Sequence, residues 1–351
     1  FMNAFSDFWN RWFIRRKDVK VVICGSATSW ILREVLQTEG SLNRRVTHSL
    51  CLRPFSLREC EEFLRNDKGI EWSRQQIIET YMVFGGVPYY LRLLQSRLSL
   101  AQNITSLCLA PQAPLKGEAK RLLDSTLSDK PLYYQTLAEL GRVKNGLPRK
   151  ELVSRLGVKD GQGFTAMLLG LEQCGYIRRY DNPYRKGRKA MYQLIDPFLL
   201  FSSRFVGSQK PLEDWAAYYD TPSYNAWRGN AFEMVCLCHL PQLRHALSLA
   251  TMHTRIFPWE SSLSSPGAQV DLVIERPDGI TYLCEMKFTS AAFSVSASYK
   301  KDLLRKVEVF KGESHTHSAV QVVVVAAAGF RHNANSDMVS QVVEGDDLFL
   351  S

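Results

Sequence analysis

The chain has 351 residues, a length that favours two or three domains over one. Hydrophobic residues make up 45% of it and charged residues 23%, which is typical of a soluble globular protein and excludes a fibrous or disordered chain. The formal net charge of +9 favours polyanionic partners such as nucleic acid.

Targeting and redox signals point to the cytoplasm. No signal peptide is visible, and the longest apolar run, residues 319–330, is too short to span a bilayer and is predicted to be a buried strand. The eight cysteines include no CxxC pair, which favours free thiols over disulfides or a zinc site. Cys236, Cys238 and His239 could hold a metal, but alternate cysteines on an apolar helix more often belong to the core. We therefore expect a cytoplasmic protein with no membrane segment.

Residues 1–125 form the first of three predicted blocks. An aromatic amphipathic helix opens the chain, and "VKVVICGSATSW" (19–30) predicts a buried strand followed by a turn. Ser56 and Glu59 predict a capping box at the start of a helix, and a Gly-Gly-Val-Pro break predicts that two further helices separate at residues 85–88. One strand among helices cannot bury both of its faces alone, so we expect part of a larger α/β domain.

Residues 126–206, the second block, predict three helices joined by short turns and followed by a hairpin, which is the order of a winged helix-turn-helix. The third helix offers few side chains that read base edges, so we expect phosphate contacts more than sequence reading. Winged helices also serve as rigid spacers or protein contacts, and that alternative stays open. The predicted DNA-contacting residues of the wing are Arg178, Arg179, Arg185, Lys186, Arg188 and Lys189.

Residues 207–351, the third block, predict a mixed α/β layer: a helix with Glu233, a candidate strand at 254–260, strands around 269–275 and 280–288 joined by a Pro-Asp-Gly turn, a helix and another strand. Alternation along the paired strands lets Asp271, Glu285 and Lys287 converge. Two carboxylates suit Mg²⁺ or Mn²⁺, and a lysine beside them can stabilise a phosphate.

The third block resembles the PD-(D/E)xK nuclease core. The matching residues are Asp271, Glu285 and Lys287, with Glu233 on the preceding helix, and Val270 stands where that motif often has proline. The resemblance implies a catalytic set of all four residues, with Asp271 and Glu285 as the metal ligands. A plain ion pair in a nuclease-derived domain is the alternative interpretation.

The whole chain resembles the C-terminal part of the archaeal-type, AAA-like P-loop ATPases. The stretches that carry this resemblance are "FWNRW", "VVICGSATSW", "LRPFSLRECEEFL" and "FGGVPYYL", followed by the winged helix and the nuclease-like domain. It implies an α/β fold with three parts: a remnant of the ATPase domain with its helical lid, a winged helix-turn-helix, and a PD-(D/E)xK nuclease-like domain.

The same resemblance implies that in a complete ATPase Ser26 and either Arg44 or Arg45 lie near the nucleotide phosphates, and that homo-oligomers form through the ATPase module. The alternative interpretation is that Ser26 only caps a strand-to-helix turn and that the arginines form a solvated face. No G-x4-G-K-[ST] phosphate loop occurs in the sequence, so ATP binding is expected only in a longer chain. The predicted function is a DNA-processing protein with a Mg²⁺- or Mn²⁺-dependent phosphodiester-hydrolysing site. The alternative is a catalytically inactive regulator of the same build that binds DNA or a protein partner.

Overall fold

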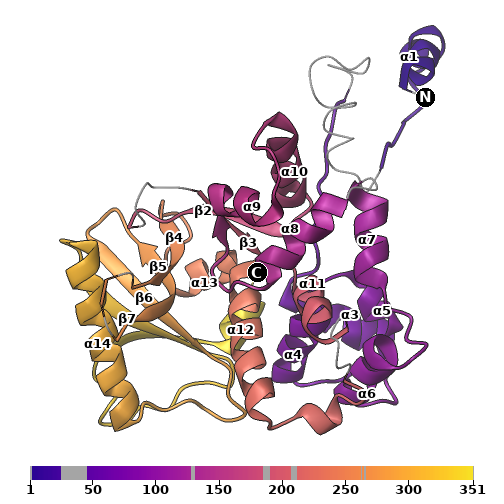
Figure 1. The fold of residues 1–351 in the computed structure, drawn as a ribbon. Helices are drawn as coiled ribbons and strands as arrows, with labels where there is room; N and C mark the ends of the chain where they lie inside the picture. Colours follow the sequence, from indigo (N-terminus) through magenta and orange to yellow (C-terminus); the bar gives the residue numbers. More distant parts are fainter. Residues whose placement is uncertain are drawn as a thin grey trace.

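The computed structural model describes residues 2–24, 46–127, 131–184, 190–206, 212–261, 263–264 and 266–350. These residues form a mixed α/β structure with a three-stranded and a five-stranded sheet (Figure 1). Within these ranges no helix is long and apolar enough to cross a membrane.

The N-terminal part of the described chain is helical. α1 (Met2–Arg11) stands off from the rest in Figure 1, and the compact part begins at residue 55. The predicted capping box is confirmed, since the Ser56 side chain accepts from the Glu59 amide and Glu59 reaches back to the Ser56 amide. The remaining described α-helices of this part are α3 (Leu57–Lys68), α4 (Arg74–Phe84), α5 (Pro88–Leu93), α6 (Leu100–Ile104) and α7 (Glu118–Leu127).

The predicted strand at residues 19–24 is wrong for the described part of this segment. Residues 19–24 and 46–52 have no regular secondary structure, and Val22, Leu50 and Leu52 are 84% to 86% exposed. A strand needs a neighbouring strand for its backbone hydrogen bonds, and none lies beside either segment among the described residues.

The predicted three helices and hairpin are confirmed. α8 (Pro131–Gly141), β1 (Leu147–Pro148), α9 (Arg149–Leu156) and α10 (Gln162–Gln173) precede the hairpin strands β2 (Ile177–Asp181) and β3 (Ala190–Leu194). β3 lies between β1 and β2, antiparallel to both. Gly157 and Gly175 follow α9 and α10 with positive φ, the left-handed conformation that ends helices.

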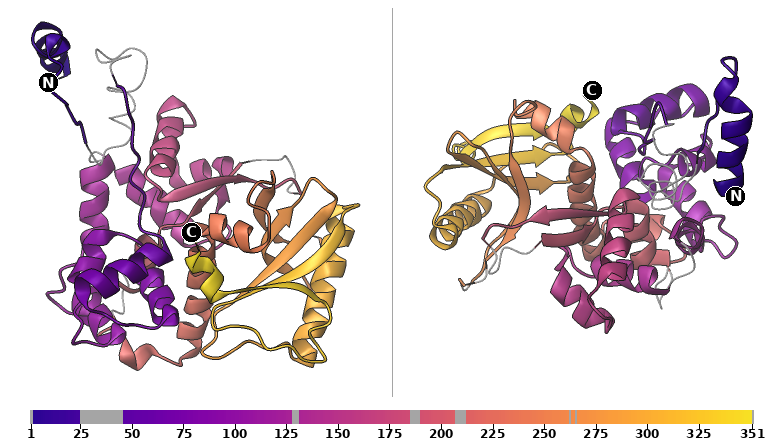
Figure 2. Two further views of the ribbon diagram at one scale, coloured as in Figure 1. Left: turned by 180° about the vertical axis from the view of Figure 1, so that it is seen from behind. Right: turned by 90° about the horizontal axis from the view of Figure 1, so that it is seen from above.

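A long helix links the N-terminal helices to the C-terminal sheet. α11 (Pro197–Phe201) leads through Trp215 to α12 (Pro222–Cys238) and α13 (Leu240–Ala246), and α12 lies between α4 and the sheet in both Figure 1 and Figure 2. The largest core cluster joins residues of α3 and α4 to Phe232 and Val235 of α12 and to Leu272 of the sheet. The first and third predicted blocks therefore share one core.

The C-terminal sheet has the strand order β4-β5-β6-β7-β8. Its members are β4 (Arg255–Glu260), β5 (Gln269–Glu275), β6 (Ile280–Lys287), β7 (Ala319–Ala326) and β8 (Val339–Glu344). β4, β5 and β6 are antiparallel neighbours, and β6, β7 and β8 run parallel. α14 (Ala297–Ser314) is the crossover between β6 and β7. It packs on the sheet face opposite α12 (Figure 2), because Phe310 contacts the Val273 side and Phe232 the Leu272 side.

Candidate active site

β5 and β6 separate at one end of the C-terminal sheet. Their last paired residues at this end are Leu272 and Cys284, although β5 begins at Gln269 and β6 continues to Lys287. Beyond this point the Met286 amide donates to Oδ2 of Asp271 at 3.0 Å. The aspartate side chain thus replaces a backbone partner at the point where the strands diverge.

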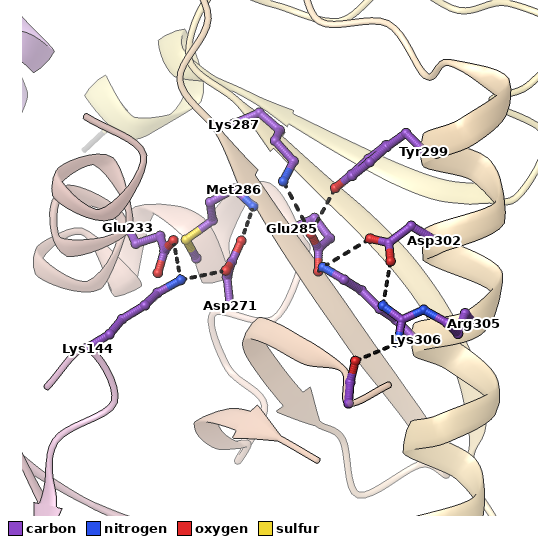
Figure 3. A network of polar contacts seen from close by, with 11 residues as sticks. Lys144, Glu233, Asp271, Glu285, Met286, Lys287, Tyr299, Asp302, Arg305 and Lys306 are labelled. Atoms are coloured by element: carbon purple, nitrogen blue, oxygen red, sulfur yellow. Dashed lines mark hydrogen bonds and ion pairs between the residues drawn. The ribbon is translucent and has the colours of Figure 1, made fainter. Parts of the chain in front are cut away.

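At this end of the sheet the ammonium of Lys144 lies between the carboxyl groups of Asp271 and Glu233 (Figure 3). Nζ of Lys144 lies 2.7 Å from Oε1 of Glu233 and 3.1 Å from Oδ1 of Asp271. The two acids come from β5 and α12, whereas Lys144 comes from the loop between α8 and β1. Glu233 is 7% exposed, so this lysine supplies positive charge to a largely buried acid pair.

The two acids of this pair differ in their ionisation. Burial, and then the charge of Asp271, raise the pKa of Glu233 to about 8, against the opposing effect of Lys144. Burial alone would raise the pKa of Asp271, but Lys144, Lys287 and the Met286 amide hold that pKa below its usual value. At neutral pH Glu233 therefore tends to keep its proton, and Asp271 carries the negative charge.

Glu285 has a separate set of partners on the α14 side of the sheet. This residue is 2% exposed, and its Oε2 accepts from Tyr299 at 2.8 Å and from Lys287 at 3.3 Å. Its Oε1 pairs with Lys306 at 2.8 Å. Both carboxylate oxygens are therefore held by donors. Burial and the charge of Glu285 raise the pKa of Tyr299, so the phenol keeps the proton that it donates.

Hydrogen bonds of the hairpin hold the loop that delivers Lys144. The Gln193 side chain donates to the backbone oxygen of Lys144 at 2.7 Å, and the Tyr180 hydroxyl donates to the backbone oxygen of Asn145 at 2.5 Å. Gly146 has φ +69°, and a Cβ there would lie 2.1 Å from the backbone oxygen of Tyr192. The loop backbone consequently packs directly on β3.

The structure therefore brings the four predicted residues to one end of the sheet but divides them into two groups. Glu233 and Asp271 share Lys144, and Glu285 pairs with Lys287. Three lysines face three acids, instead of the single lysine expected from the sequence. Among the described residues, no group of three or more histidine, cysteine, aspartate or glutamate side chains is arranged to hold a metal.

The donors themselves suit a hard divalent cation, because they are carboxylate oxygens in a largely water-excluded place. Lys144 currently occupies the cation position between Glu233 and Asp271, and Lys306 and Tyr299 hold Glu285. A metal bridging Asp271 and Glu285 would need these donors to move.

Sequence reasoning missed three residues of the site. Tyr299 and Lys306 lie on the α14 face that also carries Leu303 and Phe310, and this helical spacing is visible in the sequence. Lys144 carries no such signal, because it lies in a short loop far from the acids in sequence.

Two of the six predicted wing residues lie in the described ranges. Arg178 points inward: its Nε donates to Gln193 at 2.7 Å, its guanidinium lies 4.8 Å from the Tyr180 ring centre, and its Nη2 is buried. This burial lowers the pKa of Arg178 to about 10. Arg178 therefore has partners within the hairpin, and its contact with DNA stays a prediction. Arg179 is exposed.

The other predicted binding residues lie outside the described residues. For the wing they are Arg185, Lys186, Arg188 and Lys189, and for the nucleotide contacts they are Ser26, Arg44 and Arg45.

His239, which was weighed as a metal ligand, has both ring nitrogens engaged. Nδ1 lies 2.8 Å from the backbone oxygen of Val235, and Nε2 accepts from the Leu57 amide at 2.9 Å. The Cys238 thiol points to the backbone oxygen of Ile195 at 3.6 Å.

No protein family matches this chain, and the comparisons with curated proteins and with solved structures also found no match.

Proposed function

We propose that the C-terminal part of this protein is a metal-dependent phosphodiester-hydrolysing domain of the PD-(D/E)xK type that acts on DNA. One observation carries the proposal: Glu233, Asp271, Glu285 and Lys287 lie at the end of the sheet where β5 and β6 separate. The order of elements, one helix, three antiparallel strands, a crossover helix and a parallel strand, agrees with it.

The four residues have complementary roles in this proposal. Asp271 and Glu285 hold Mg²⁺ or Mn²⁺, which would polarise the phosphate and lower the pKa of a bound water. Lys287, whose side chain is 26% exposed, stabilises the negative charge that develops on the phosphate oxygens. Glu233 would accept the proton of the attacking water in its deprotonated form, and its raised pKa of about 8 means that the share of this form grows as the pH rises towards 8.

The hairpin supplies the DNA contact in this account. Arg179 is exposed on β2, and the four remaining cations of the wing follow within ten residues of it in the sequence. Cations on a hairpin loop suit a phosphate backbone without reading bases. Membership of an AAA-like ATPase family, with homo-oligomers, is part of the same proposal.

One observation favours a second function. The three carboxylates are already neutralised by Lys144, Lys287 and Lys306, as expected for an inactive nuclease-like domain that serves as a DNA- or protein-binding regulator. Retained catalytic residue types favour the first proposal, and their lysine partners favour the second.

Incubation of the full chain with single-stranded, duplex and branched DNA in Mn²⁺ separates the two. Cleavage that needs Mn²⁺ and is lost in Lys287→Met supports hydrolysis, because this variant keeps the length of the side chain and removes its charge. Lys150→Met, an exposed lysine of α9, is the matched control and should cleave normally. Cleavage that persists in Lys287→Met, or no cleavage of any substrate, leaves the regulator as the better account.

A further inference from the structure

The Lys144 ammonium occupies the position where a cation between Glu233 and Asp271 would lie. It contacts both carboxylates, at 2.7 Å and 3.1 Å, and belongs to a loop of the winged unit more than 80 residues earlier in the chain. An ammonium and a divalent ion seek the same oxygens there, so the two cannot bind the pair together.

The backbone of the loop that carries Lys144 is fixed by specific contacts. Gln193 and Tyr180 hold the backbone of the loop, and Gly146 allows that loop to touch β3. Tyr180 also belongs to a core cluster with Trp259 and Val270, next to Asp271. The hairpin is therefore packed against the sheet at the site, and the start of the Lys144 side chain is fixed with it.

The end of the side chain remains free to leave. The Lys144 side chain is 27% exposed, and its Nζ is held by Glu233 and Asp271, whereas the Gln193 hydrogen bond acts on its backbone oxygen. Rotation of the flexible four-carbon chain can take Nζ into water without moving the loop.

We propose that Lys144 is a built-in counter-cation that closes the site, and that a divalent metal reaches its ligand Asp271 only by displacing it. This inference rests on the proposed metal site and adds its regulation. The winged unit thereby controls the C-terminal site through one side chain. Movement of the 143–146 loop away from the sheet would also remove Lys144 and open the site. Packing of the β2–β3 hairpin against the sheet keeps the site closed.

The direct test is to titrate the wild type and Lys144→Met with Mn²⁺ and to measure the binding affinity by isothermal calorimetry. Methionine keeps the chain length and removes the charge, so the variant should bind Mn²⁺ at least about tenfold more tightly, a difference of about 1.4 kcal/mol. Lys144→Met should also have a lower melting temperature without metal and regain it with Mn²⁺, because its acids lose their counter-cation. Lys150→Met should behave as the wild type in both measurements.

A second measurement needs no variant. Lysine acylation, read by mass spectrometry of the peptide that contains Lys144, should become several-fold faster in the wild type when Mn²⁺ is saturating. An unchanged rate at saturating Mn²⁺ would mean that metal binds with Lys144 still in place, which overturns the inference.

The outcomes distinguish this inference from the proposed function. Equal Mn²⁺ affinity in the wild type and Lys144→Met, lost in Asp271→Asn, would keep the metal site and reject the role of Lys144. No Mn²⁺ binding by a folded Lys144→Met would reject both.

Discussion

Acid should weaken the attachment of α12, the helix that carries Glu233, to the N-terminal helices. His239 directly follows the last residue of α12 and is 1% exposed. Its Nδ1–H donates to Val235, and its Nε2 must stay unprotonated to accept the Leu57 amide of α3 at 2.9 Å. Protonation of Nε2 would place its N–H next to the Leu57 N–H inside the core, where neither group could accept a hydrogen bond.

The magnitude follows from the shift in the pKa of His239. Burial lowers this pKa from 6.5 to about 4, so between these values the unfolded chain binds a proton that the folded chain does not. The stabilisation is complete above pH 6.5 and is lost as the pH falls towards 4. From pH 7.5 to pH 4.5 the expected loss in the free energy of unfolding is about 2.5 kcal/mol, at about 1.4 kcal/mol per pKa unit.

His239→Phe isolates this contribution. The variant keeps an aromatic ring but leaves the buried Leu57 amide without its acceptor, so at pH 7.5 it should be less stable by about 1–3 kcal/mol. At pH 4.5 the deficit should shrink by about 2.5 kcal/mol, because the variant has no imidazole to protonate.

Urea denaturation of both proteins, followed by tryptophan fluorescence at the two pH values, measures the difference. Other titrating groups are common to both chains and cancel in it. The exposed His245 of α13 supplies the control His245→Gln, which should keep the wild-type pH dependence. A deficit of His239→Phe that is equal at both pH values would refute the neutral-imidazole reasoning.

Three further predictions concern the site and the hairpin. Gly146→Ala should lower the free energy of unfolding by more than about 2 kcal/mol in urea denaturation, because the added Cβ would overlap the Tyr192 backbone. Gly157→Ala has a similar φ of +63° but open space around it, so it should cost only about 1 kcal/mol. Equal costs would contradict the close approach at Gly146. Tyr299→Phe should lower the free energy of unfolding by about 1.5–3 kcal/mol through loss of the hydrogen bond to Glu285, and an unchanged value would show that this contact adds no stability. Duplex DNA binding should weaken with salt by a slope of roughly 0.9 per phosphate contact, and the slope should flatten in a triple alanine variant; an unchanged slope would place the contact elsewhere. That variant replaces Arg185, Lys186 and Arg188.

Local signals in the sequence predicted most of the helices and the two hairpins. The Ser56 capping box and the Pro-Asp-Gly turn between β5 and β6 each depend on neighbours within a few residues. The structure has each of them where the pattern indicates. Local signals also placed Glu285 and Lys287 on one strand face, because alternation along a strand needs no partner.

Long-range packing decided what the sequence could not predict. The apolar residues 19–24 have strand composition, but a strand forms only beside another strand, and the described residues offer none there. β8 was missed because only Val343 of this strand is buried, so the strand is defined by its parallel pairing with β7. Lys144 was missed because its role depends on a loop from one unit reaching acids of another.

The central claim is that Asp271 and Glu285 bind a divalent metal after Lys144 leaves. Crystals of the full chain grown in Mn²⁺ and measured at the manganese absorption edge test it most directly. The account predicts an anomalous peak within about 2.2 Å of carboxylate oxygens of Asp271 and Glu285, with Lys144 Nζ turned towards solvent. No peak at a saturating Mn²⁺ concentration, with Lys144 still between Glu233 and Asp271, would contradict it.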